Sequence, residues 1–281
     1  MQMFQTGPNR YPSKSTDAYA TINQRTLAFF VGLVAIGLPL FLWLGAHNPI
    51  LETCFRDSIS HFYYAPFWGG PFIGSLIFIG TYMWVYQGED AHAAEGRLAS
   101  IAGVFAFGVA LFPTSGHGCD DPAFAARALV SFGSDPEFLD LIKAKALDGR
   151  PDIAPYFQLT SYSAHIHYLS ATLLFSFLAW FALVVFTAVD PHQRHADGTL
   201  TRDKIMRNTL YYVCGAVMIL CIVAMALSAA LRAWSGINMD WWNAGNWTFW
   251  CEAFALWAFG LSWMVKGRFW DTLLKDEKER V

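Results

Sequence analysis

The stretch Asp57–Glu89, DSISHFYYAPFWGGPFIGSLIFIGTYMWVYQGE, decides the fold class, because a polar and aromatic cluster runs directly into a long apolar segment. After Asp57 the chain carries no formal charge until Glu89. An uncharged apolar segment of this length is typical of a helix that spans the hydrocarbon core of a bilayer. We therefore predict a membrane span at 70–87, with polar and aromatic side chains at its entrance.

Five further apolar segments occur, at 27–46, 98–114, 162–189, 208–231 and 246–265. Only 15% of the 281 residues are charged, whereas a soluble domain carries about a quarter. The segments do not alternate as membrane β-strands do, so each span has to satisfy its backbone as a helix. Gly103 and Gly108 predict close helix approach. We predict an all-α polytopic membrane protein, with six transmembrane helices within residues 27–267.

The positions of the basic residues predict the orientation. Six spans place both termini on one side, and 13 of the 19 lysine and arginine residues lie in the termini and the short loops of that side. The positive-inside rule then puts both termini in the cytoplasm. We predict a multi-pass protein of the bacterial plasma (inner) membrane, with a polar cytoplasmic tail at 1–26 and a cytoplasmic amphipathic tail at 268–281. The net charge of −3 does not favour a nucleic-acid partner.

A long insertion at about 115–160 separates the third and fourth spans. Within it, 121–133 and 135–149 each begin with Asp-Pro and end with Gly, which are helix start and stop signals. We predict two short external helices at 122–132 and 136–148. They either rest on the bundle or form a lid over an outward-facing pocket.

Two of the five cysteines, Cys54 and Cys119, fall in the predicted external loops. In an oxidising periplasm they can pair as a disulfide that ties the first loop to the long one. The alternative is two free thiols.

Polar side chains gather at the predicted outer ends of the spans. Glu252 is the strongest candidate for function, because an ionisable group inside a span is costly unless it is paired or hydrated. A structural hydrogen bond between helices remains the alternative. His165 and His167 lie two positions apart, about 200° around a helix, so at most one faces the bundle. We prefer His167, which shares a helix face with Ser163 and Ser170.

Ser58 and Ser60 lie close to His61 in the sequence, which suggests a serine nucleophile with a histidine base. The alternative is a capping role, because serines at a span entrance more often cap the helix. No HExxH, HxxxH or CxxC motif occurs, so a standard zinc signature is absent. The predicted pocket consists of Ser58, Ser60, Tyr63, His167 and Glu252, and the candidate metal ligands are His61, His117 and His167.

Several motifs together resemble a group of uncharacterised bacterial six-helix membrane proteins, described as a domain of unknown function. They are SISHFYY at 58–64, the exit Tyr86-Gln87-Gly88, LASIAGVFAFGVALFPT at 98–114 and FWCEAFALWAFGLSWMVKG at 249–267. The resemblance covers roughly 27–115 and 160–268 and implies the six-helix topology without an activity. His61 stands where the relatives have a small residue, and the segment 115–150 looks like an insertion.

A fainter similarity points to the ceramidase-like membrane hydrolases, which use Ser, Asp and three His around zinc at one membrane face. Ser58, His61 and His167 are the matching residue types. The missing HxxxH argues against this family, since that spacing places two ligands on one helix face.

The leading hypothesis is a non-catalytic membrane component that binds a lipid, a small ligand or a partner membrane protein through the pocket. The first alternative is a metal-assisted hydrolase of lipid headgroups, with zinc on the three histidines and Glu252 or Asp57 as base. The second is a haem- or pigment-associated subunit that uses His165 or His167. Whether the chain is an enzyme stays open at this level.

Overall fold

The computed structural model describes residues 24–48, 54–65, 67–86, 93–114, 162–189, 193–235 and 237–267, and the single positions 50 and 160. Across these ranges the regular structure is helical, apart from one isolated bridge between Arg194 and Leu200. The all-α prediction is therefore confirmed. Most of the predicted N-terminal tail, the C-terminal tail and both predicted external helices lie outside the described residues.

In the part of the chain that the structure describes, six long helices make up the architecture, and each coincides with one predicted span. They are α1 (Gln24–Ala46), α2 (Gly69–Val85), α3 (Ala93–Leu111), α5 (Ser163–Trp180), α6 (Arg202–Ala230) and α8 (Trp247–Lys266). In the described ranges, four short elements accompany them: a 3₁₀ turn η1 (Ser60–Tyr64), the π-helical segments η2 (Phe181–Val185) and η4 (Leu231–Ser235), and α7 (Asp240–Ala244).

The helix ends differ from the predicted span ends. Helix α6 begins at Arg202, six residues before the predicted start, because the Thr201 side chain caps its N-terminus by accepting from the Lys204 backbone N–H. A hydropathy pattern detects the apolar part of a helix but not the polar residues by which the helix extends beyond it. Helix α7 was not predicted, since five residues leave no periodic pattern.

Among the described residues, four helical stretches are long and apolar enough to cross a membrane: Leu27–Ala46, Ser163–Val185, Arg202–Trp234 and Trp247–Lys266. Helix α2 is apolar but shorter, at 17 residues. Helix α3 carries Glu95 and Arg97 near its start. The length and composition of these four helices therefore support a membrane protein.

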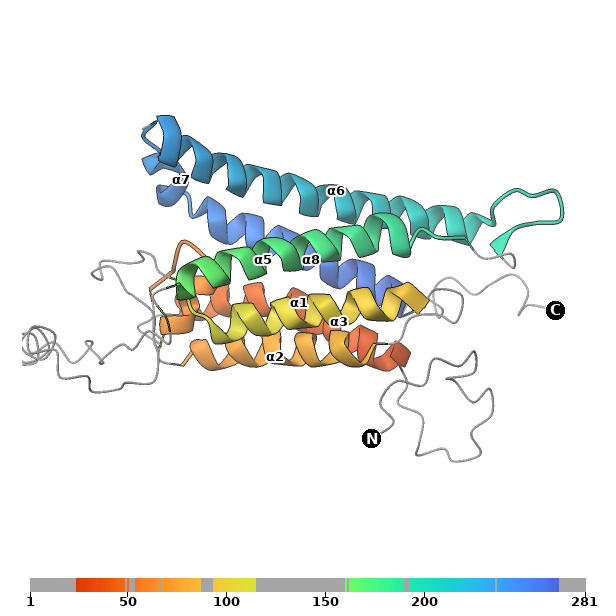
Figure 1. Ribbon diagram of the computed structural model, residues 1–281, viewed down its shortest axis with the longest axis horizontal. Helices are drawn as coiled ribbons and strands as arrows, with labels where there is room; N and C mark the ends of the chain where they lie inside the picture. Colours follow the sequence, from red (N-terminus) through yellow and green to blue (C-terminus); the bar gives the residue numbers. More distant parts are fainter. Residues whose placement is uncertain are drawn as a thin grey trace, which may run out of the picture.

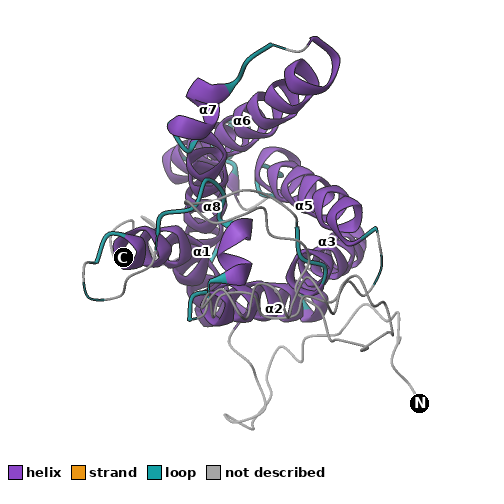
Figure 2. Ribbon diagram, turned by 90° about the vertical axis from the view of Figure 1, so that its left-hand side faces the viewer, coloured by secondary structure: helices purple, strands orange, loops and turns teal. Residues whose placement is uncertain are grey.

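The long helices lie roughly side by side along one axis, with α6 at the outer side of the bundle (Figure 1). Around the bundle, each helix contacts the next in the order α1, α2, α3, α5, α6 and α8, and α8 packs back against α1. Figure 2 shows this arrangement along the helix axes. The elements form a closed ring of neighbours, so side chains from distant parts of the sequence meet in its interior.

Glycines let several neighbouring helices approach closely. A Cβ placed on Gly260 of α8 would lie 2.6 Å from the Gly32 carbonyl oxygen of α1, and one on Gly32 would lie 2.6 Å from the Gly260 carbonyl oxygen. A Cβ on Gly103 of α3 would lie 2.7 Å from the carbonyl oxygen of Gly80 in α2. The close approach predicted for Gly103 is confirmed, and small residues at such crossings are typical of membrane helices.

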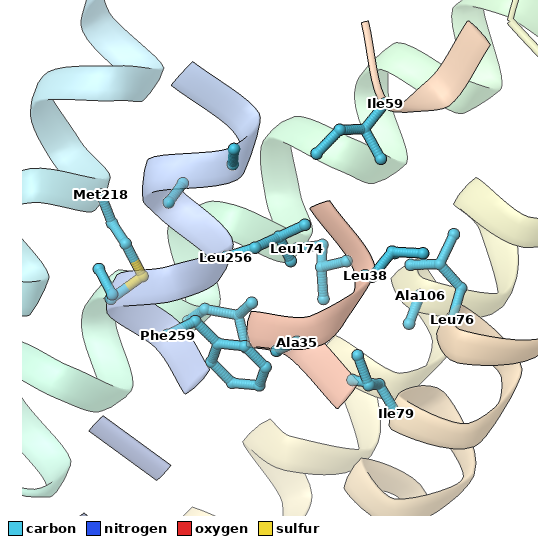
Figure 3. Packing of buried hydrophobic residues seen from close by; sticks show 14 of the residues in the cluster. Ala35, Leu38, Ile59, Leu76, Ile79, Ala106, Leu174, Met218, Leu256 and Phe259 are labelled. Carbon is cyan, nitrogen blue, oxygen red and sulfur yellow. The ribbon is translucent and has the colours of Figure 1, made fainter. Parts of the chain in front are cut away.

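The apolar core lies inside this ring. Figure 3 shows Leu38, Leu76 and Ala106 from α1, α2 and α3, with Leu174 and Leu256 from α5 and α8. Met218 of α6 lies on the other side of α8, near Phe259. Ile59, which precedes η1, is also part of the core. The chain therefore packs onto the end of the bundle through the residue that precedes the 3₁₀ turn.

An aromatic cluster closes the bundle at the end where α8 finishes. The Trp263 ring is fully buried, and its centroid lies 5.3 Å from that of Tyr82, 5.1 Å from Tyr86 and 5.2 Å from Phe186. The Tyr86 hydroxyl donates to the buried Glu95 carboxylate at 2.6 Å. This bond satisfies an acid at the start of α3 that would otherwise be costly to bury.

Lysine capping joins α5 to α6 at the same end. The Lys204 ammonium donates to the Phe186 carbonyl at 3.1 Å and to the Ala188 carbonyl. These carbonyls lie just past η2, where the last carbonyls of a helix have no backbone partner.

In the loop between the helices, the Thr199 hydroxyl and backbone N–H donate to the Asp197 carboxylate. These two hydrogen bonds hold the pKa of the Asp197 carboxyl below its usual range.

Candidate functional site

The candidate site lies at the opposite end of the bundle, where the segment 54–64 folds over the helix ends. In Figure 1 this segment is the orange stretch beside the starts of α5 and α8. The Phe249 backbone N–H in the first turn of α8 donates to the Asp57 carbonyl at 2.8 Å. Phe55 packs on Phe249, with 4.6 Å between ring centroids. Aromatic packing and one backbone bond thus fix the segment against α8.

Glu252 is the anchor for the residues before η1. Its carboxylate accepts from the Ser58 hydroxyl, with Oγ 3.0 and 2.9 Å from the two oxygens, and from the Ile59 backbone N–H at 2.6 Å. The Ser58 oxygen in turn accepts from the Ser60 backbone N–H at 3.1 Å. Glu252 therefore sets the backbone position of Ser60 through a relay of two hydrogen bonds.

Ser60 and His167 form a hydrogen-bonded pair between η1 and α5. Ser60 Oγ lies 3.0 Å from His167 Nε2, and His167 Nδ1 lies 2.7 Å from the Phe112 carbonyl oxygen. A carbonyl oxygen only accepts, so Nδ1 carries the ring proton. In the neutral ring, Nε2 is then the acceptor for the Ser60 hydroxyl. The side chains are 8% and 2% exposed, so water competes little for this bond.

A second histidine pair lies beside the first. His61 Nδ1 is 2.5 Å from Oδ1 of Asp57, which lies four positions earlier in the chain. His61 is also within electrostatic range of His167 and Glu252. The carboxylate of Asp57 accepts from Nδ1, which orients the His61 ring and favours the tautomer with its proton on Nδ1.

The structure brings together most of the predicted pocket residues. Ser58, Ser60, His167 and Glu252 lie in connected hydrogen bonds, and Tyr63 follows in the same 3₁₀ turn, half-buried. His167 is buried together with Ser163 and Ser170, as the helical spacing predicted, whereas His165 is exposed. His117 and Cys119 lie outside the described residues, so the third metal ligand and the Cys54–Cys119 disulfide stay predictions.

Two expectations about the serines are wrong. Ser60 does not pair with its neighbour His61, because successive residues of a 3₁₀ turn point about 120° apart, and its partner is His167. The serines do not cap the next span either. Helix α2 begins only at Gly69, with Trp68 as its N-cap residue and no side-chain cap.

The Phe112 carbonyl is a functional group that sequence reasoning missed. It follows the end of α3 at Leu111, where the last carbonyls of a helix lack partners. Pro113 comes next and has no backbone N–H with which to continue the ladder. A Phe-Pro dipeptide after an apolar segment indicates that the carbonyl of the Phe has no backbone partner. The sequence around Phe112 does not indicate that His167 is the donor to this carbonyl.

The predicted metal ligands lie only partly within the described residues, because His117 is outside them. Within the described ranges, no group of three or more His, Cys, Asp or Glu side chains is placed to hold a metal ion. His61 and His167 are two imidazoles of the predicted set, each with Nδ1 directed at an oxygen.

Comparison with known proteins adds no assignment. No protein-family model, curated protein or solved structure matches this chain. The resemblances to the uncharacterised six-helix family and to the ceramidase-like hydrolases therefore stay predictions, and function has to be argued from the geometry of this site.

Proposed function

We propose that the chain is a membrane-embedded hydrolase of acyl esters or amides, with Ser60 as nucleophile and His167 as general base. The observation that carries this proposal is the 3.0 Å bond between Ser60 Oγ and a His167 ring whose tautomer is set by the Phe112 carbonyl. A nucleophile, a base and a group that orients the base are the three parts of such a site. The binding-only role that the sequence favoured stays a prediction beside this proposal.

The proposed topology has six spans, with both termini in the cytoplasm of a bacterial cell and the site at the outer face of the plasma membrane. The positive-inside count supports this orientation. Helices α2 and α3 lie alongside the four longer apolar helices in one bundle, which supports counting them as spans (Figure 1). At 17 residues, α2 is about 25 Å long, a little less than the roughly 30 Å hydrocarbon core.

In the proposed reaction, Ser60 Oγ attacks the carbonyl carbon of the substrate while its proton passes to His167 Nε2. The imidazolium keeps its Nδ1–H bond to the Phe112 carbonyl, and then gives the proton to the leaving alcohol or amine. Water, deprotonated by the same nitrogen, cleaves the acyl-Ser60 ester. A lipid is the favoured substrate class, because acyl carbonyls of membrane lipids lie at the depth of the span ends.

A serine-directed fluorophosphonate probe tests this proposal on the full chain in detergent or nanodiscs. Wild-type protein is expected to react at Ser60, Ser60→Ala is expected to lose the label, and His167→Gln is expected to react about 10²–10⁴-fold more slowly. Ser176→Ala is the matched control, because Ser176 is a serine of α5 whose hydroxyl bonds only locally to the Thr172 carbonyl. Equal labelling of folded Ser60→Ala and wild type contradicts the proposal.

A second candidate is a metal-assisted hydrolase in which His61 and His167 bind zinc. The observation that favours it is that both rings direct Nδ1 at an oxygen, from Asp57 and Phe112 respectively. Metal-binding histidines commonly use this arrangement to orient the Nε2 atom toward the ion. Asp57 would then orient a ligand and would not serve as the base. A haem or pigment role has no observation of its own among the described residues.

Metal analysis of the gently purified protein separates the two candidates. The metal-assisted reaction predicts about one zinc per chain, lost in both His61→Ala and His167→Ala. Retained zinc in either variant removes that histidine from the ligand set. A protein that is free of metal and still labels at Ser60 rejects the second candidate and keeps the first.

A further inference from the structure

We propose that the Ser163 hydroxyl is the hydrogen-bond donor to the oxyanion that forms when Ser60 attacks an acyl carbonyl. This inference rests on the proposed hydrolase function and adds one more side chain to it. Ser163 is the first residue of α5, and its side chain is only 1% exposed. Among the described residues, its Oγ atom has no hydrogen-bond partner. A buried hydroxyl without a partner costs free energy, so its presence needs an explanation.

Ser163 lies beside the reacting pair. It precedes His167 by four positions, and both side chains are buried on one face of α5, with their Cβ atoms about 5–6 Å apart. Helical side chains lean toward the N-terminus, which brings the His167 ring over the turn that contains Ser163. The same ring holds Ser60 Oγ at 3.0 Å from Nε2. The start of α5 also lies beside the segment 54–64 in Figure 1.

The backbone around Ser60 has no N–H group to spare for an oxyanion. The four consecutive N–H groups of residues 59–62 donate to acceptors within the protein, at 2.6, 3.1, 3.2 and 3.1 Å. The first two reach the Glu252 carboxylate and Ser58 Oγ, and the other two reach backbone carbonyls. Backbone N–H groups or side-chain hydroxyls can both serve as oxyanion donors. The negative oxygen therefore requires a donor from outside this stretch, and the Ser163 hydroxyl is one.

The proposed hydrogen bond leaves the Ser163 proton in place. When Ser60 Oγ bonds to the carbonyl carbon, the electron pair of the C=O π bond moves to the oxygen, and the Ser163 O–H donates to that oxygen. When the intermediate collapses, the pair re-forms the carbonyl and the leaving group departs with the proton from His167 Nε2. The donor acts on charge that the ground state lacks, so its loss lowers kcat and leaves KM nearly unchanged.

Hydrolysis of p-nitrophenyl butyrate by the full chain in detergent tests the assignment. Ser163→Ala is expected to lower kcat about 10²–10³-fold with little change in KM. Ser163→Thr keeps a hydroxyl and is expected to recover most of the lost rate. Ser170→Ala is the matched control and is expected to keep the wild-type rate, because Ser170 is buried on the same face of α5 but its hydroxyl faces Gly108 of α3. An unchanged kcat in Ser163→Ala overturns the proposal.

Stability and inhibitor binding separate this role from a structural one. Ser163→Ala removes a buried hydroxyl that has no partner, so its melting temperature is expected to equal or exceed that of wild type. Phenylboronic acid forms a tetrahedral adduct on a nucleophilic serine, and its Kd is expected to rise by the same factor by which kcat/KM falls. A lower melting temperature together with unchanged boronate binding assigns the hydroxyl a structural role and overturns the proposal.

The serine-directed probe keeps this test apart from that of the proposed function. If wild type labels at Ser60 and hydrolyses the ester while Ser163→Ala matches it in rate, the oxyanion assignment alone fails. If folded Ser60→Ala hydrolyses the ester as fast as wild type, the hydrolase proposal and the oxyanion assignment fail together.

Discussion

Glu252→Ala is expected to lower the free energy of unfolding by about 2–4 kcal/mol. The substitution removes the acceptor for the Ser58 hydroxyl and the Ile59 backbone N–H, and both donors are then left in a largely buried position. Water reaches Ser58 poorly, since that side chain is almost fully buried. Denaturant unfolding in a fixed detergent, followed by helical circular dichroism, measures the loss.

Two companion variants separate the carboxylate from its partners. Glu252→Gln keeps one carbonyl oxygen as acceptor and is expected to lose about 1 kcal/mol. Ser58→Ala removes one donor and leaves the bond from Ile59 intact, so its loss is expected to be similarly small. If Glu252→Ala unfolds at the same denaturant concentration as wild type, the carboxylate does not hold the segment before η1, and its relay to Ser60 fails as well.

Gly260→Ala is expected to destabilise the bundle by about 1–3 kcal/mol through overpacking. The added Cβ would meet the Gly32 backbone oxygen at 2.6 Å and the Ile36 side chain at 2.7 Å. A backbone oxygen cannot move aside as a flexible side chain can, so α1 and α8 have to separate. Gly260→Val is expected to cost more, and the same unfolding assay measures both variants.

Gly37→Ala is the matched control on α1. A Cβ at Gly37 meets nothing within 4 Å, so the substitution adds no clash. Alanine loses less backbone entropy than glycine in a helix, which predicts a gain of about 0.5–1 kcal/mol. A gain at Gly37 together with a loss at Gly260 assigns the cost to the helix contact. Tolerance of Gly260→Ala at wild-type stability would show that the two helices do not pack this closely.

Sequence reasoning reached the helices because their signal is local. An apolar run of about 20 residues predicts a helix at that place whatever surrounds it, and all six runs coincide with long helices. The ends were less accurate, as α6 shows, since its first turns depend on the Thr201 cap and on polar residues that hydropathy does not register. The inward orientation of His167 also followed from local information, the 3.6-residue period of α5.

The partners of the site residues were decided by tertiary structure alone. Ser60 meets His167, 107 positions later, and Ser58 meets Glu252, 194 positions later. Proximity in the chain pointed to His61 as the partner of Ser60, but the 3₁₀ turn directs these neighbours apart. The hydrogen bond between η1 and α5 brings in His167 instead. The sequence by itself determined the helices and the residue types at their ends. The ring of six packed helices decided which of those ends meet, because contacts between distant segments depend on helix order around the bundle, which no local pattern records.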